Sequence, residues 1–150
     1  MAEVLFYHLT RSKLEDTLPR LLGKTLERGW RAVLQGMTQA RIDALDEHLW
    51  TFQEESFLPH GQAGGAREDE QPLILTVGDA NPNRATVRFF VEGAAPEGDL
   101  TGYERCVMMF DGEDATQLAE ARKAWKALKA DGHDVTYWQQ TPRGGWEQKA

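Results

Sequence analysis

Short apolar runs alternate in this sequence with segments of helical periodicity, and this alternation restricts the possible folds more than any other feature. The run at residues 73–77 is almost continuously apolar, which is typical of a strand covered on both faces of a parallel sheet. Further strands are predicted at residues 4–9, 30–35, 86–91, 105–110 and 134–138. Strands that alternate with helices form βαβ units. We therefore predict one α/β domain over residues 1–150, with three α/β/α layers and a mainly parallel, Rossmann-like sheet.

The first predicted helix has signals at both ends. Ser12, followed three residues later by Glu15, predicts a capping box at its start, and Gly29 predicts its end. The apolar face consists of the leucines at positions 14, 18, 21, 22 and 26. Their spacing is that of one face of an amphipathic helix.

Two more helices and one loop are predicted downstream. The second helix should begin at Thr38 and stop near Trp50, because Pro59 and several glycines follow. The third is predicted over residues 114–131. Residues 61–72 are polar and rich in Gly, Glu and Asp, so we predict a long mobile loop there.

Charge and cysteine content restrict the functional class. The net charge of −7 argues against a general nucleic-acid binder, which needs a basic surface, and so against direct DNA binding. A local basic patch remains compatible with an acidic chain. The single cysteine, Cys106, forms no internal disulfide, and no stretch is long and apolar enough to span a membrane. We expect a cytoplasmic protein without membrane contact.

Motifs for catalysis are weak. Gly23-Lys24-Thr25 lacks the glycine that a phosphate loop has five residues earlier, where Leu18 stands. The four histidines show no metal-ligand spacing; His8 is predicted at the end of the first strand and His48 on a solvated helix face. Cys106 lies in a buried run and is predicted to pack in the core. We therefore expect no active site, no cofactor and no bound metal.

The third predicted helix carries two adjacent stripes. One is apolar and consists of Leu118, Ala121, Trp125 and Leu128; the other is basic and consists of Arg122, Lys126 and Lys129. Trp125 lies on their border. One interpretation is a core tryptophan beside a solvated basic face. The other is a small pocket with an apolar floor and a cationic rim, suited to an acidic peptide that ends in an apolar side chain and a carboxylate.

Large aromatic residues continue past the second predicted helix. Trp50, Phe52 and Phe57 occupy a region that should be a connection. Aromatic residues in a connection either cover the edge of the core or bind a partner. Both interpretations stay open for Trp50 and Phe57.

The block at residues 45–60 carries a family resemblance. It reads Leu-Asp-Glu-His-Leu-Trp, a short spacer, and then Glu-Ser-Phe-Leu-Pro-His. This pattern resembles the chi subunit of the bacterial DNA polymerase III holoenzyme, a clamp-loader accessory protein. Residues 4–9 and residues 121–126 resemble, in the type of residues they contain, the corresponding segments of the family. The resemblance covers most of the chain in order, and residues 45–60 are its specific part.

The resemblance implies a non-catalytic adaptor in DNA replication with two protein-binding sites. On the third helix, Arg122, Trp125 and Lys126, with Lys129 beside them, look like the site for the acidic C-terminal tail of single-stranded DNA-binding protein, which ends in Pro-Phe. Trp125 stands where the family has a tyrosine.

The second implied site uses Trp50 and Phe57, together with Pro59 and His60, to hold the psi subunit and through it the clamp loader. The same surface would suit a DNA-repair helicase, so an adaptor for such a helicase is an alternative. A nucleotide-dependent enzyme on the same fold is a further alternative, against which the missing phosphate loop argues.

Overall fold

The computed structural model describes residues 3–10, 13–51, 59–96, 100, 102–143 and 145–150. In chain order the elements are β1 (Glu3–Leu9), α1 (Leu14–Glu27), β2 (Ala32–Gln35), α2 (Gln39–Thr51), β3 (Gly61–Gln62), the 3-10 helix η1 (Glu68–Glu70), β4 (Leu73–Thr76), β5 (Val87–Val91), β6 (Arg105–Asp111), α3 (Ala115–Ala130), β7 (Asp134–Gln140) and β8 (Trp146–Gln148). No helix among these described residues has the length and hydrophobicity needed to span a bilayer.

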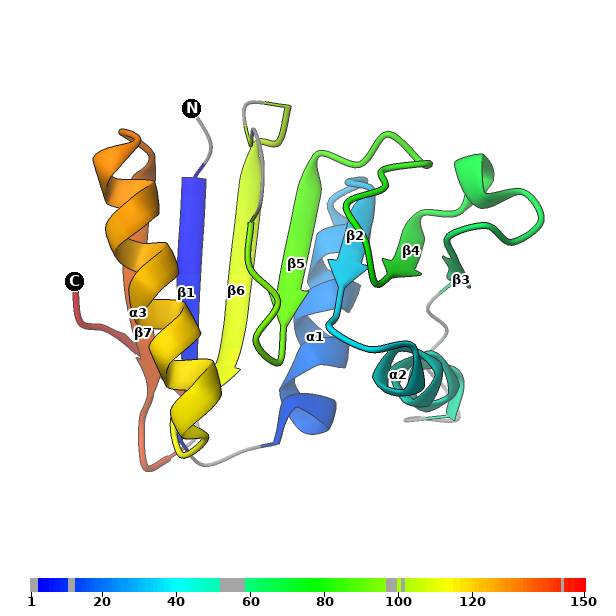
Figure 1. The fold of residues 1–150 in the computed structure, drawn as a ribbon. Coiled ribbons are helices and arrows are strands. Elements are labelled where there is room, and N and C mark those ends of the chain that lie inside the picture. The colour runs from blue at the N-terminus through cyan, green and yellow to red at the C-terminus, as the bar shows by residue number, and fades with distance from the viewer. Residues whose placement is uncertain (1–2, 11–12, 52–58, 97–99, 101, 144) are drawn as a thin grey trace.

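The strands form one eight-stranded sheet in the order β3-β4-β2-β5-β6-β1-β7-β8. All neighbouring strands are parallel except β7 and β8, which are antiparallel. Helix α3 covers one face, and α1 and α2 cover the other (Figure 1). The predicted three-layer α/β fold with a mainly parallel sheet is confirmed.

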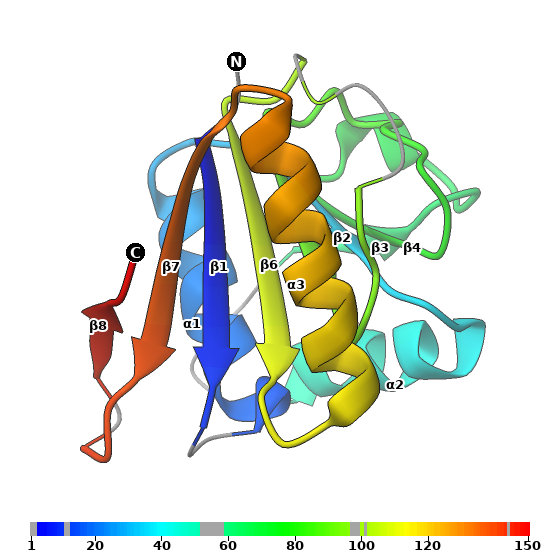
Figure 2. The ribbon, with the colours of Figure 1, turned by 60° about the vertical axis from the view of Figure 1, so that its left-hand side comes forward.

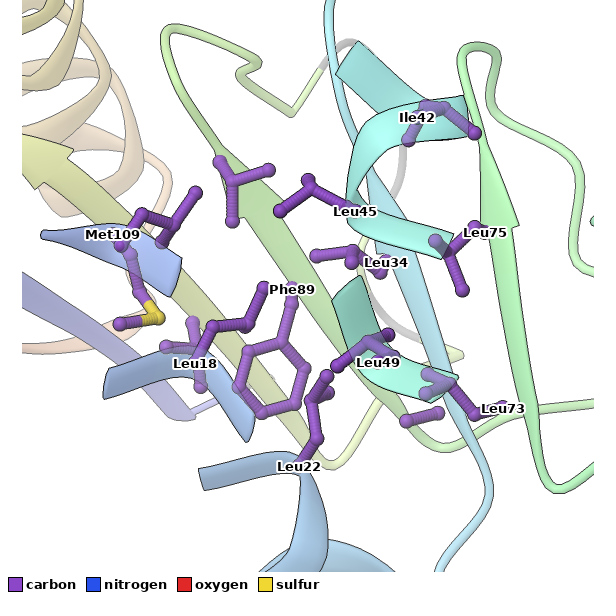
Figure 3. Packing of buried hydrophobic residues seen from close by; sticks show 14 of the residues in the cluster. Leu18, Leu22, Leu34, Ile42, Leu45, Leu49, Leu73, Leu75, Phe89 and Met109 are labelled. Atoms are coloured by element: carbon purple, nitrogen blue, oxygen red, sulfur yellow. The ribbon is translucent and has the colours of Figure 1, made fainter. Parts of the chain in front are cut away.

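Strand β5, in which Arg88 is the one polar residue, shows why the central strands are largely apolar. All five of its residues are buried, and neighbours along a strand point to opposite faces. Phe89 packs into the cluster beneath α1 and α2, whereas Phe90 packs into the cluster beneath α3. In Figure 3, Phe89 lies beside Leu18 and Leu22 of α1. Both faces of the central strands therefore need apolar side chains.

The helix boundaries agree with prediction to within about two residues, and the capping signal fails only at the start of α1. The Asp114 carboxylate accepts hydrogen bonds from the backbone N–H groups of Thr116 and Gln117, both at 3.0 Å, and caps α3. Gly29 follows α1 with a φ of +80°, as expected for its C-terminal glycine. The predicted cap of α1 is wrong: its N-cap is Lys13, which makes no side-chain cap hydrogen bond. Ser12 itself lies outside the described residues.

Two short strands were missed. Residues 61–72 contain β3, which pairs with β4, and the 3-10 helix, so the prediction of one long loop is wrong. The strand predicted at residues 134–138 runs on to Gln140, and β8 then pairs with it. Strands of two and three residues are too short to show a periodicity. Trp146 of β8 is held by Tyr7, with ring centroids 4.8 Å apart.

Leu22 and Leu21 offer a matched test of the α1 packing. Leu22 is fully buried, whereas its neighbour Leu21 is only partly buried. We expect Leu22→Ala to lower the free energy of unfolding by about 3 kcal/mol, because it leaves a cavity. Leu21→Ala should cost clearly less. Urea-induced unfolding measures both, and equal losses would contradict this packing.

Candidate protein-binding sites

Trp125 of α3 is at once a core residue and a pocket wall. Ala121, Ala124 and Leu128 bury the helix against the sheet. The half-buried Trp125 ring meets Phe6 edge-on at 5.4 Å between centroids and Tyr137 at 5.8 Å. Edge-to-face contacts of this kind fix a ring's orientation. The two interpretations drawn from the sequence therefore describe the same side chain.

A hollow of about 350 Å³ lies beside this ring, and we call it the α3 pocket. It is lined by Phe110, Leu118, Ala121, Arg122, Trp125, Lys126, Tyr137 and Ala150. Most of these side chains are apolar, and the two cations are Arg122 and Lys126. The structure thus brings together three of the four residues predicted for the peptide site, Arg122, Trp125 and Lys126, with Leu118 and Ala121 of the apolar stripe.

Lys129 takes a different position. It does not line the α3 pocket; its Nζ lies 5.0 Å from the centroid of the Trp125 ring. This is cation–π geometry. Lys129 therefore holds its charge over the ring and adds to the positive potential beside the pocket.

A hydrogen bond supports the floor of the α3 pocket. Nδ1 of His8 and the hydroxyl of Tyr137 are 2.6 Å apart. Burial lowers the pKa of His8; Asp111 opposes this effect and Arg122 adds to it. Burial also raises the pKa of Tyr137, against the opposing charge of Arg122. Both groups are therefore held neutral near pH 7, and the rim cations carry the pocket's charge. No local sequence pattern predicts this pair, because His8 and Tyr137 are 129 residues apart.

Trp50, near the end of α2, heads the second candidate site. It is 47% exposed, and its ring lies against the imidazole of His60, with centroids 4.1 Å apart and planes at 30°. The His60 side chain has no exposed surface, and its Nε2 lies 2.8 Å from Oδ1 of Asp46. His60 thus supports Trp50 from the interior. Pro59 is half-buried, and Phe57 lies outside the described residues.

Strand β3, which was not predicted, is hydrogen-bonded to α2 through the side chain of Gln62. Nε2 of Gln62 donates to Oδ2 of Asp46 at 2.9 Å and to Oδ1 of Asp43 at 3.1 Å. The prediction that His48 lies on a solvated helix face is wrong. Its Nε2 lies 2.7 Å from the carbonyl oxygen of Glu15, and this contact joins α2 to α1. Such contacts join segments far apart in sequence, so no local pattern reports them.

The groups that the sequence offered as candidates for catalysis are not placed for it in the structure. Burial raises the pKa of the Cys106 thiol to about 12, so the thiolate that nucleophilic chemistry needs is not formed. Gly23-Lys24-Thr25 lies within α1. Across the described part of the chain, no group of three His, Cys, Asp or Glu side chains is placed to hold a metal ion.

Comparison with known proteins gives consistent matches. A model of the family described as "DNA polymerase III chi subunit, HolC" matches residues 1–136. The DNA polymerase III subunit chi of Pseudomonas aeruginosa is 27% identical over 116 residues, which cover 77% of this chain and 79% of that protein. The probable DNA polymerase III subunit chi of Rickettsia prowazekii is 26% identical over 87 residues, which cover 58% of this chain but only 53% of that protein.

The lowered pKa of His8 predicts a pH effect on stability. The folded state binds this proton less readily than the unfolded state, so the stability that neutral His8 provides is present above its unfolded pKa. It is lost as pH falls toward the folded pKa. We expect the stability advantage of the wild type over His8→Gln to shrink as pH falls from about 7.5 to about 5.5. Urea unfolding of both proteins measures it, and a constant difference would contradict the assignment.

Proposed function

The chain belongs to the DNA polymerase III chi subunit family, and on that premise we propose that it is a non-catalytic adaptor that joins the clamp-loader assembly to single-stranded DNA-binding protein. The family match over residues 1–136 assigns an accessory role in DNA replication. The named partners are our proposal. The observation that carries it is the α3 pocket, where an apolar hollow and two cations adjoin.

The chemistry of the α3 pocket suits an acidic peptide that ends in phenylalanine. The terminal ring would enter the hollow beside Trp125 and Tyr137, where edge-to-face contacts favour an aromatic ligand. Arg122 and Lys126 would pair with the terminal carboxylate and the acids before it. Lys129 lies outside the lining and would contribute charge rather than a contact. The C-terminal tail of single-stranded DNA-binding protein has this chemistry.

The second partner would bind at Trp50. An exposed indole fixed by a buried imidazole offers a rigid, apolar anchor, and tryptophan is enriched among the residues that dominate binding energy at interfaces. Phe57 and Pro59 join it by family resemblance, while His60 would act by supporting the indole. The psi subunit is the proposed occupant. A repair helicase is the alternative for the same surface.

The two sites lie on different layers of the fold. The α3 pocket is on one face of the sheet, and α2, which carries Trp50, covers the other. Two partners would therefore bind without competing for space. Linked binding raises the effective concentration of the second partner, so modest affinity for each tail suffices.

Titration calorimetry with an acidic peptide that ends in Asp-Ile-Pro-Phe tests the tail site. We expect micromolar binding that weakens with salt, because ions screen exposed charge pairs. Lys126→Ala removes a charge pair and Trp125→Ala removes a ring contact, so each should weaken peptide binding by about tenfold. Lys123→Ala is the matched control, since Lys123 is exposed on the same helix but does not line the pocket.

Two results would overturn the tail site. One is the absence of binding at any salt concentration. The other is an equal effect of Lys123→Ala and Lys126→Ala, which would show that only the overall charge matters. A peptide with an amidated C-terminus should bind more weakly, because it lacks the terminal carboxylate.

Pull-down from cell extract, read by mass spectrometry, tests the second site. We expect Trp50→Ala and Phe57→Ala each to lose clamp-loader components while retaining single-stranded DNA-binding protein. Met37→Ala is the control, since Met37 is an exposed apolar residue before the start of α2. Loss of a helicase instead would assign the alternative partner. If both variants recover the same proteins as the wild type, this surface is not the binding site of the second partner.

A further inference from the structure

The face of the sheet opposite α3 holds a groove that the proposed function does not use. Two adjoining hollows of about 340 and 210 Å³ lie between α1 and strands β1, β7 and β8. They share Leu21, Lys24 and Trp146 as lining residues, so they form one continuous depression, which we call the α1 groove. Figure 2 shows β8 at the edge of the sheet beside β7, with α1 on the face away from α3.

Aromatic rings form the sheet side of the α1 groove. Tyr7 and Trp138 are register partners on β1 and β7, so their side chains are on the same face. Trp146 of β8 meets Tyr7 edge-on at 4.8 Å between centroids. All three rings are half-buried. They offer apolar surface on three neighbouring strands rather than one closed hollow.

Cations form the helix side. Arg20, Lys24 and Arg28 recur every four residues, so they lie on one side of α1 with a rise of about 6 Å between them. All three are exposed, and none takes part in an ion pair among the described residues. Asp16 is the one acid that lines the described groove, at the end near Arg20.

At the far end of the α1 groove, two guanidinium groups lie close to the Trp30 ring. The guanidinium carbons of Arg28 and Arg105 lie 5.3 and 5.2 Å from its ring centroid. Arg105 also pairs with Glu3 at 2.8 Å, which holds it in place. The row of cations along α1 therefore ends in a fixed cluster of rings and guanidinium groups.

We propose that the α1 groove binds single-stranded nucleic acid without sequence preference. Proteins that do so combine a positively charged groove, which follows the phosphates, with aromatic rings that stack on the bases. The regular row from Arg20 to Arg28 matches a repeating anion, and the three half-buried rings offer surfaces on which flat bases can stack. An acidic peptide with one apolar terminus would instead need a single hollow like the α3 pocket.

The net charge of −7 does not oppose this assignment. It argues against binding over the whole surface, because the acidic surroundings repel phosphates. It restricts binding to the α1 groove, where cations are concentrated. The proposal is independent of the tail site, since the two surfaces lie on opposite faces of the sheet.

Fluorescence anisotropy with a labelled oligothymidylate at low salt tests the proposal. We expect binding that falls with salt and quenches the intrinsic tryptophan emission. Lys24→Glu/Arg28→Glu should weaken binding at least about tenfold and reduce the slope of log affinity against log salt by about 0.7 for each lost phosphate contact. Arg67→Glu/Arg84→Glu is the control, because it changes the net charge equally at exposed positions in loops near β3, β4 and β5, away from the groove.

A ring substitution separates stacking from general charge attraction. Trp146→Ala should weaken oligothymidylate binding, whereas Trp146→Phe, which keeps a stacking ring, should retain most of it. Unchanged urea-unfolding transitions would show that these variants are folded. The proposal is overturned if the wild type does not bind at low salt, or if the two charge-reversed pairs weaken binding equally. It is also overturned if the groove variants lose the peptide and not the oligonucleotide.

Discussion

The pairing of β1 between β6 and β7 is the constraint on which both faces of this molecule depend. The N-terminal strand has a late strand on each side, in parallel register from Glu3 onward. Its side chains alternate, so the adjacent residues Phe6 and Tyr7 point to opposite faces. Phe6 supports Trp125 beside the α3 pocket, and Tyr7 supports Trp146 in the α1 groove. A shift of one residue would exchange these side chains between faces and disrupt both surfaces.

The positive charges of this molecule are concentrated in two places, although its net charge is negative. An acidic chain presents cations on both faces: Arg122 and Lys126 at the α3 pocket, and the row from Arg20 to Arg28 along α1. A negative background directs anionic ligands toward such patches and away from the rest of the surface. The clamp-loader role proposed for the chain would place both patches next to acidic tails and exposed DNA.

The sequence was sufficient wherever a local pattern carries the signal. The apolar run at residues 73–77 predicted a strand buried on both faces, and α3 was predicted together with its own side chains that line the α3 pocket. The lining residues from other elements, Phe110, Tyr137 and Ala150, were not predicted. Contacts between distant segments were out of reach. Local spacing cannot show that His60 lies under Trp50, or that Tyr7, Trp138 and Trp146 come together on three strands. The capping box at Ser12 was wrong because the helix begins from Lys13 instead.

The strand order has a consequence for how the chain is made. A chain leaves the ribosome N-terminus first, but β1 has no sheet neighbour until β6 has emerged, about a hundred residues later. Until then the apolar strand β1 has no strand to pair with. Bringing β1 and β6 together closes a loop of about a hundred residues, which is slow compared with forming local contacts. Strand β2 pairs with both β4 and β5, and all three are complete before β6 appears. The half of the sheet that carries α2 can therefore assemble first, and the half that carries both cationic surfaces completes only near the end of synthesis.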